Sequence, residues 1–173
     1  MTTTIATPPP TINPKLIAPF VNAVRSVFRS MVNVQTTINR PHLKCEPCPA
    51  HDVSGIIGFS GETSGSVVVS FQMAAAEKLA SAFAGTAITS DSPDFADAIG
   101  ELANMIAGSA KKDLGGLANI SVPSVIIGRN HQLARLSDVP CVVVPCSTPV
   151  GDFCVEVNIK MNNVPTSAHE VPQ

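Results

Sequence analysis

The sequence of 173 residues contains no tryptophan and no tyrosine, so its seven phenylalanines are its only aromatic residues. A stacking platform for single-stranded nucleic acid needs exposed aromatic rings, and a core of this size needs most of the phenylalanines inside. Charge is also scarce: 14% of the residues are charged, and 11 Lys plus Arg against 13 Asp plus Glu give a formal charge of −2. Because the basic excess typical of nucleic-acid binding is missing, we expect no nucleic-acid partner.

The sequence also lacks a long hydrophobic run. No apolar stretch reaches the roughly 18 residues that a membrane-spanning helix requires, so we expect no membrane partner. The N-terminus has no basic patch followed by an apolar segment, which is the pattern of a secretory signal. The five cysteines are an odd number, and we interpret them as reduced thiols. Together these absences predict a cytoplasmic protein.

Length and apolar content predict a single folded domain. The 45% of apolar residues can form a substantial core in a chain of this size. Residues 1–14 are rich in threonine and proline and nearly uncharged, which predicts a disordered leader. Residues 162–173 have a similar composition and are expected to form a flexible tail. The domain is therefore expected to span 15–161.

Three segments carry apolar residues at helical spacing, which predicts helices over 18–31, 73–84 and 93–113. Pro19 fits the first turn of the first helix, where a missing N–H is tolerated. Ser92 is the expected side-chain cap of the third helix.

Strand patterns fill the remainder of the predicted domain. A Gly-rich turn between two apolar segments predicts an antiparallel hairpin over 55–71. Further strands are expected over 119–128, 139–147 and 152–161, and the last alternates an apolar face with a face that carries Glu156. Because strands and helices come in runs rather than alternating one for one, we predict an α+β fold with a largely antiparallel sheet.

The predicted helix 93–113 carries a ridge of polar residues opposite its apolar stripe. The ridge consists of Asp97, Glu101, Asn104 and Gly108, whose spacings of four, three and four nearly complete whole turns. A polar outer face is the default for an amphipathic helix, and this interpretation stays open. A glycine inside a helix costs about 1 kcal/mol relative to alanine, which indicates that a partner surface approaches Gly108 closely.

The segment DAIGELANMIAG at 97–108 resembles the signature of the CheC/CheX family of chemotaxis phosphatases. That signature reads Asp or Ser, three residues, Glu, two residues, Asn, three residues, Gly. Residues 19–31 (PFVNAVRSVFRSM) resemble the first helix of the family, and the Gly-rich hairpin over 55–71 also fits. The single copy of the motif is closer to CheX than to the duplicated CheC arrangement. Some members carry a proline after the Asn, and Pro123 is a candidate for it, although we assign it no role.

The resemblance implies a CheX/CheC-like fold, in which helices cover a mostly antiparallel sheet, and a phosphatase of the CheC/CheX type. Its substrate would be the phospho-aspartate of a CheY-like response-regulator receiver domain. Glu101 is implied to anchor the receiver through the receiver's active-site lysine, and Asn104 to position the attacking water. Asp97 and Gly108 are candidates for partner binding, with Asp97 alternatively serving the helix dipole.

The resemblance further implies a homodimer and no cofactor on this chain, with Mg²⁺ held by the receiver's own carboxylates. The alternative from another functional class is a non-catalytic module of the same fold that binds a receiver domain or a motor component. Phosphate release from a phosphorylated receiver distinguishes the two.

The segment HLKCEPCPAH contains four potential zinc ligands at intervals of three: His42, Cys45, Cys48 and His51. Several prolines stiffen this segment, and all four ligands fall within ten residues, whereas structural sites usually join two separated pairs. The family resemblance calls for no metal. We therefore predict no metal site, and a small zinc-binding structural protein remains a third interpretation.

Overall fold

The structure, a computed structural model, describes residues 12–45, 51–115, 118–133 and 139–162. In these ranges one sheet has strands in the order β1-β7-β8-β4-β3-β5, with β2 also paired to β7 and β6 to β3. The strands are β1 (Thr37–Ile38), β2 (His42–Leu43), β3 (His51–Gly61), β4 (Thr63–Phe71), β5 (Ala118–Ile120), β6 (Ser124–His131), β7 (Val142–Thr148) and β8 (Gly151–Met161). All of these strand pairs are antiparallel, which confirms the predicted α+β class.

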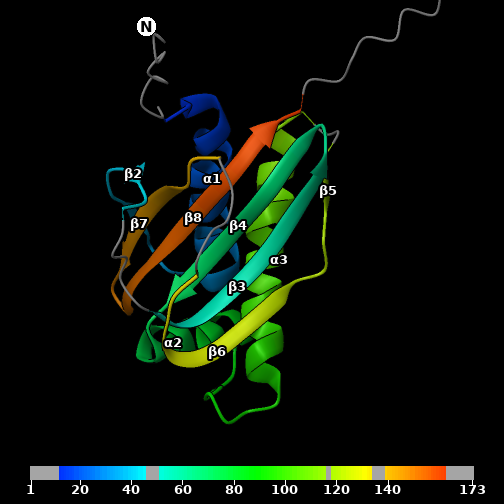
Figure 1. Cartoon of the computed structure of the whole chain (residues 1–173). Coiled ribbons are helices and arrows are strands. Elements are labelled where there is room, and N and C mark those ends of the chain that lie inside the picture. Colours follow the sequence, from blue (N-terminus) through cyan, green and yellow to red (C-terminus); the bar gives the residue numbers. More distant parts are fainter. Residues whose placement is uncertain (1–11, 46–50, 116–117, 134–138, 163–173) are drawn as a thin grey trace, which may run out of the picture.

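The helices lie on one face of this sheet (Figure 1). They are α1 (Pro14–Val27), which continues into the π-helical turn η1 (Phe28–Val32), α2 (Met73–Ala84) and α3 (Asp94–Asp113). Their apolar sides and the inner face of the sheet share one core. Phe28 stacks on Phe153 of β8 with ring centroids 4.6 Å apart, so the core ties the first helix to the last strand. Burial of each such side chain stabilises the fold by about 1.5–3 kcal/mol.

The first helix begins earlier than predicted. Pro14 occupies its first turn, and the side-chain oxygen of Asn13 caps it by accepting a hydrogen bond from the Lys15 amide at 3.1 Å. The predicted helix over 18–31, with Pro19 in the first turn, is therefore wrong at its start. Pro19 lies inside the helix and is buried, so packing compensates for the backbone hydrogen bond that a proline cannot donate.

The predicted hairpin and second helix are confirmed. Strands β3 and β4 pair over Val53–Phe59 with Gly65–Phe71. Helix α2 has the predicted bounds and is capped at its C-terminus by Gly85, whose φ of +69° lies in the left-handed region that favours glycine. Its first amide, on Met73, donates to the carboxylate of Asp52 at 3.0 Å.

The start of α3 differs from the prediction in its cap. Ser92 was expected to cap the helix with its side chain, but it contributes its backbone carbonyl, which accepts from the Phe95 amide at 3.1 Å. The helix begins at Asp94, so its acidic first turn, with Asp94 and Asp97, lies at the positive end of the helix dipole.

The predicted strand over 119–128 is two strands. β5 and β6 both pair with β3, and 121–123 interrupts them. At the interruption the Ser121 amide donates to the Gly58 carbonyl at 2.9 Å, and the Gly58 amide donates to the Ser121 hydroxyl at 3.0 Å. Pro123 has no N–H to donate to a ladder, which favours a break in the strand at this point.

The described elements run from Pro14 to Met161. Most of the predicted leader and tail lies outside the described residues, so the boundaries 15–161 stay a prediction. None of the helices in the described ranges combines the length and the apolar character needed to cross a membrane.

Candidate functional site

Helix α3 presents the motif because its apolar stripe is held against β3 and α1. The predicted stripe is confirmed, since its members are all buried: Phe95, Ala98, Ile99, Leu102, Ile106 and Ala110. Gly55 of β3 allows a close approach, because a Cβ on it would lie 2.8 Å from the Ala103 Cβ. This contact fixes the rotation of α3 about its axis, and the polar ridge consequently faces away from the core.

The polar ridge brings Glu101 and Asn104 into direct contact. The Glu101 side chain is exposed and Asn104 is half-buried. The Asn104 amide donates from Nδ2 to Glu101 Oε2 at 3.2 Å. Asp97 is exposed one turn earlier on the same helix. A carboxylate and a neutral carboxamide are thus presented side by side on a rigid element.

Gly108 ends the ridge, and the described part of the fold offers no internal reason for a glycine there. A Cβ on Gly108 would have the Ile120 Cδ1 as its nearest neighbour, at 4.0 Å, which is an ordinary contact. Space is available for a side chain, in contrast to the crowded position of Gly55.

A shallow hollow of about 510 Å³ adjoins Glu101. Its lining comes from α3, from the connection between β5 and β6, and from β6 itself: Ala96, Asp97, Gly100, Glu101, Pro123 and Val125. Gly100 packs closely beneath Pro123, since a Cβ on it would lie 3.4 Å from the Pro123 ring, which is van der Waals contact. Pro123 is thus a site residue to which the sequence analysis assigned no role. The signal that could have found it is a proline inside an otherwise regular strand pattern. Its neighbour Val122 is 83% exposed.

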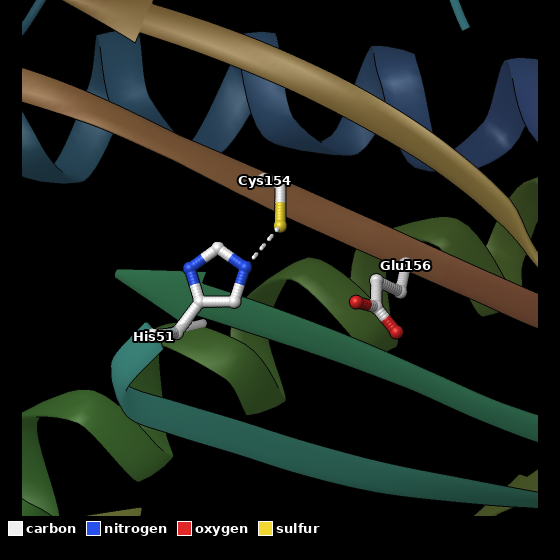
Figure 2. Close-up of side chains that lie close together, drawn as sticks. All are labelled: His51, Cys154 and Glu156. Atoms are coloured by element: carbon white, nitrogen blue, oxygen red, sulfur yellow. Dashed lines mark hydrogen bonds between the residues drawn. The ribbon is translucent and has the colours of Figure 1, made fainter. Parts of the chain in front are cut away.

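The four potential zinc ligands, for which we predicted no metal site, are only partly brought together. His42, Cys45 and His51 line a pocket of about 160 Å³ on the sheet face opposite the helices, and Cys48 lies outside the described residues. Within the pocket, His51 faces β8 rather than its neighbours in sequence: its Nε2 lies 3.4 Å from the Cys154 Sγ (Figure 2).

The same pocket holds a buried ion pair. Lys44 Nζ lies 3.0 Å from both carboxylate oxygens of Glu156, and the exposed fractions of the two side chains are 10% and 5%. Lys44 also donates to the Leu133 carbonyl at 3.2 Å. Burial lowers the pKa of His51 below its ordinary value, while the charge of Glu156 acts in the opposite direction. On the inner face of the sheet, burial raises the pKa of the Cys146 thiol to about 12, so that thiol stays protonated.

Comparison with known proteins assigns the family. The model of the family described as "Chemotaxis phosphatase CheX" matches residues 53–147, more than half of the chain. The curated CheY-P phosphatase CheX of Thermotoga maritima is 27% identical over 123 residues, which cover 69% of this chain and 79% of that protein.

Solved structures agree with this assignment. A CheC-like superfamily protein from Shewanella sp. PV-4 superimposes with a TM-score of 0.78 at 30% identity, over 86% of this chain and 99% of the other. A chain of the CheX–CheY–BeF3–Mg²⁺ complex from Borrelia burgdorferi gives a TM-score of 0.71 at 26% identity, over 84% of this chain and 97% of that chain. The matched residues include the whole motif on α3, and the chain, a hydrolase by this assignment, belongs to the chemotaxis phosphatase CheX family.

Proposed function

We propose that this protein hydrolyses the phospho-aspartate of a CheY-like receiver domain, with Asn104 positioning the attacking water and Glu101 anchoring the receiver. The observation that carries the proposal is the contact between these two side chains on the outer face of α3. The partner is inferred from the relatives, one of which is named a CheY-P phosphatase and another of which was solved in complex with CheY.

The carboxamide of Asn104 suits the chemistry of phosphoryl transfer. The transition state is loose, so catalysis depends on an in-line water and on electrostatic support more than on a strong base. An amide can accept a hydrogen bond from the water and donate one to a phosphoryl oxygen without adding negative charge. One N–H of the Asn104 side chain donates to Glu101, so the second N–H and the carbonyl oxygen remain for this role.

Glu101 is suited to docking because it is exposed and lies one turn before Asn104. A lysine of the receiver would take the place of the Asn104 amide at the Glu101 carboxylate. This exchange fastens the partner and frees the amide for the water in a single step. Correct orientation of the reacting groups can then lower the barrier by several kcal/mol.

The surroundings of Glu101 supply a docking surface. Asp97 lines the hollow next to Glu101, and the exposed Val122 adds an apolar contact beside Pro123. Gly108 extends the ridge with a patch of bare backbone, on which a partner can approach the helix closely. We expect Mg²⁺ to be bound by the receiver's carboxylates rather than by this chain.

The test is phosphate release from a phosphorylated receiver domain. Asn104→Ala should reduce the rate by about 100-fold or more, since loss of a single group that orients or stabilises the reacting atoms typically has this effect. Binding of the receiver should change by less than about threefold, because the anchor is intact. Asn22→Ala, the same change at an exposed position of α1, serves as the matched control and should retain full activity.

Two outcomes would contradict this function. A wild-type rate in Asn104→Ala would remove the amide from the mechanism. Binding of the phosphorylated receiver without any phosphate release by the wild-type chain would favour the non-catalytic receiver-binding module. A homodimer is a further expectation from the family, and light scattering of the purified chain tests it.

A further inference from the structure

The outer face of the sheet holds a cluster of three side chains for which the phosphatase motif has no use. His51 begins β3, and Cys154 and Glu156 lie two residues apart on β8, so that both point to the same face (Figure 2). One ligand atom from each residue lies within 4.8 Å of the other two. We propose that His51, Cys154 and Glu156 form a binding site for a divalent transition-metal ion, with Zn²⁺ as the best-suited ion.

The donor set determines the class of metal. Imidazole, thiolate and carboxylate are all common ligands of zinc. Magnesium and calcium prefer sites made of oxygen atoms alone, so a site with a sulfur and a nitrogen donor selects against them. The two anionic ligands would balance the charge of the dication once the Cys154 thiol has released its proton to solvent.

The distances fit a tetrahedral centre after small side-chain rotations. Neighbouring ligand atoms around a four-coordinate zinc lie about 3.3–3.8 Å apart, given bond lengths near 2.0–2.3 Å. The separation of 3.4 Å between His51 Nε2 and Cys154 Sγ is already of this size. The Glu156 carboxylate lies within 4.8 Å of both atoms, and it must move toward them by about 1 Å to complete the set.

The pocket leaves room for a fourth ligand of the metal. It holds about 160 Å³, which is enough for several water molecules. A metal held by three residues would therefore carry a water that faces the pocket. This arrangement differs from the four-ligand site within 42–51, because it needs β8 and does not need Cys45.

Lys44 is a positively charged neighbour that disfavours the binding of a cation at this site. Its ammonium contacts both oxygens of Glu156. A carboxylate has enough lone pairs to accept a hydrogen bond from an ammonium at one oxygen and to coordinate a metal with the other. Lys44 would keep its hydrogen bond to the Leu133 carbonyl. Two cations on one carboxylate still repel each other, so Lys44 should weaken metal binding without preventing it.

The site is placed to strengthen the fold rather than to take part in hydrolysis. It would join the start of β3 to β8. Cys154 and Glu156 alternate along β8 with residues of the core that the helices cover, so the site lies on the sheet face opposite α3. Metal binding should therefore raise the thermal stability of the chain and leave the rate of phosphate release unchanged. This second expectation separates the metal site from the proposed phosphatase function.

The experiment uses the untagged full chain, stripped with a chelator and titrated with Zn²⁺ and with Co²⁺ as a spectroscopic substitute. We expect one equivalent of metal per chain by elemental analysis, and a thiolate-to-cobalt charge-transfer band. Cys154→Ala should weaken binding by at least about 100-fold, because even residues that only support a ligand contribute about 10–100-fold. Cys45→Ala is the matched control from the same pocket and should change affinity by less than about tenfold.

The reverse pattern, with Cys45→Ala losing the metal and Cys154→Ala keeping it, would overturn the proposal in favour of a site within 42–51. Binding of less than about one tenth of an equivalent by the wild-type chain would also overturn it. Lys44→Met supplies an independent measurement: metal affinity should rise about tenfold, and added Zn²⁺ should raise its melting temperature more than that of the wild type. An unchanged affinity in Lys44→Met would exclude Glu156 as a ligand.

Discussion

Two glutamates on opposite faces of the molecule show how burial changes what a carboxylate can do. Glu101 is exposed on α3 and contacts the neutral amide of Asn104. Glu156 is buried on β8 and contacts the ammonium of Lys44. An exposed carboxylate can exchange its partner at little cost because water solvates it during the exchange. A buried carboxylate depends on its cation, because an unpaired charge in the interior is strongly unfavourable.

The difference shows which of the two contacts contributes to partner binding and which to the stability of the chain. The Glu101–Asn104 pair adds little to the stability of the chain, so it is available to a partner. The Glu156–Lys44 pair holds the residue that follows β2 against β8, so the chain's own stability depends on it. Substitutions should therefore separate the two regions into one that affects binding and one that affects folding.

The largest expected effect on stability comes from Lys44→Met. Lys44→Met removes the ammonium that contacts both carboxylate oxygens of the buried Glu156, and we expect a loss of about 3 kcal/mol in the free energy of unfolding in metal-free buffer. Urea unfolding followed by circular dichroism measures it. A loss below about 0.5 kcal/mol would show that the ion pair behaves as a surface contact. The contrast drawn between the two glutamates would then be wrong.

Glu101→Ala should show the opposite behaviour. The free energy of unfolding should change by less than about 0.5 kcal/mol, because the side chain is exposed. Affinity for the phosphorylated receiver should fall about tenfold, which corresponds to about 1.4 kcal/mol. Titration calorimetry with a receiver carrying a phosphate mimic measures the affinity, and an unchanged value would remove Glu101 from the interface.

The ridge on α3 could be predicted from sequence because its geometry is local. Residues three and four apart on a helix share a face whatever surrounds the helix, so Asp97, Glu101, Asn104 and Gly108 follow from spacing alone. The apolar stripe opposite is equally local, and it supplies most of the driving force for α3 to pack with this face outward.

The remaining features depend on contacts between distant parts of the chain. The alternation along 152–161 places Cys154 and Glu156 on one face, but only the register of β3, β4 and β8 brings His51 to them. Pro123 reaches the site through the break between β5 and β6. The start of α1 was misplaced for a related reason: burial of Pro19 outweighs the hydrogen bond that it cannot make.

Gly108→Ala sharpens the contrast on α3 itself. Alanine is favoured over glycine in a helix by about 1 kcal/mol, and the new Cβ has room. The free energy of unfolding should therefore rise by about 0.5–1 kcal/mol, while affinity for the receiver falls because the added methyl group keeps the partner away from the helix. Gly55→Ala is the matched control: its Cβ meets Ala103 at 2.8 Å, and overpacking should destabilise the chain by about 1–3 kcal/mol.

These two glycines test whether the ridge is a contact surface. Thermal unfolding of both variants gives the stabilities, and receiver titration of Gly108→Ala gives the affinity. A stabilised Gly108→Ala that binds the receiver as tightly as the wild type would mean that no partner approaches the helix at Gly108.

Glu77 of α2 is an intermediate case between the two glutamates, and we expect the smallest effect there. Its carboxylate Oε1 accepts from the Ser90 amide at 2.8 Å, and this hydrogen bond, together with one from the Ser90 side chain, lowers the pKa of Glu77. A pKa that is lower in the folded state means that the stabilisation is present above the ordinary pKa of glutamate and is lost as the pH falls through the folded value. Glu77→Gln should therefore be less stable than the wild type at neutral pH and approach it in acid. Urea unfolding of both proteins across this range measures the difference, and an equal difference at every pH would show that the carboxylate's charge contributes nothing to holding the connection between α2 and α3.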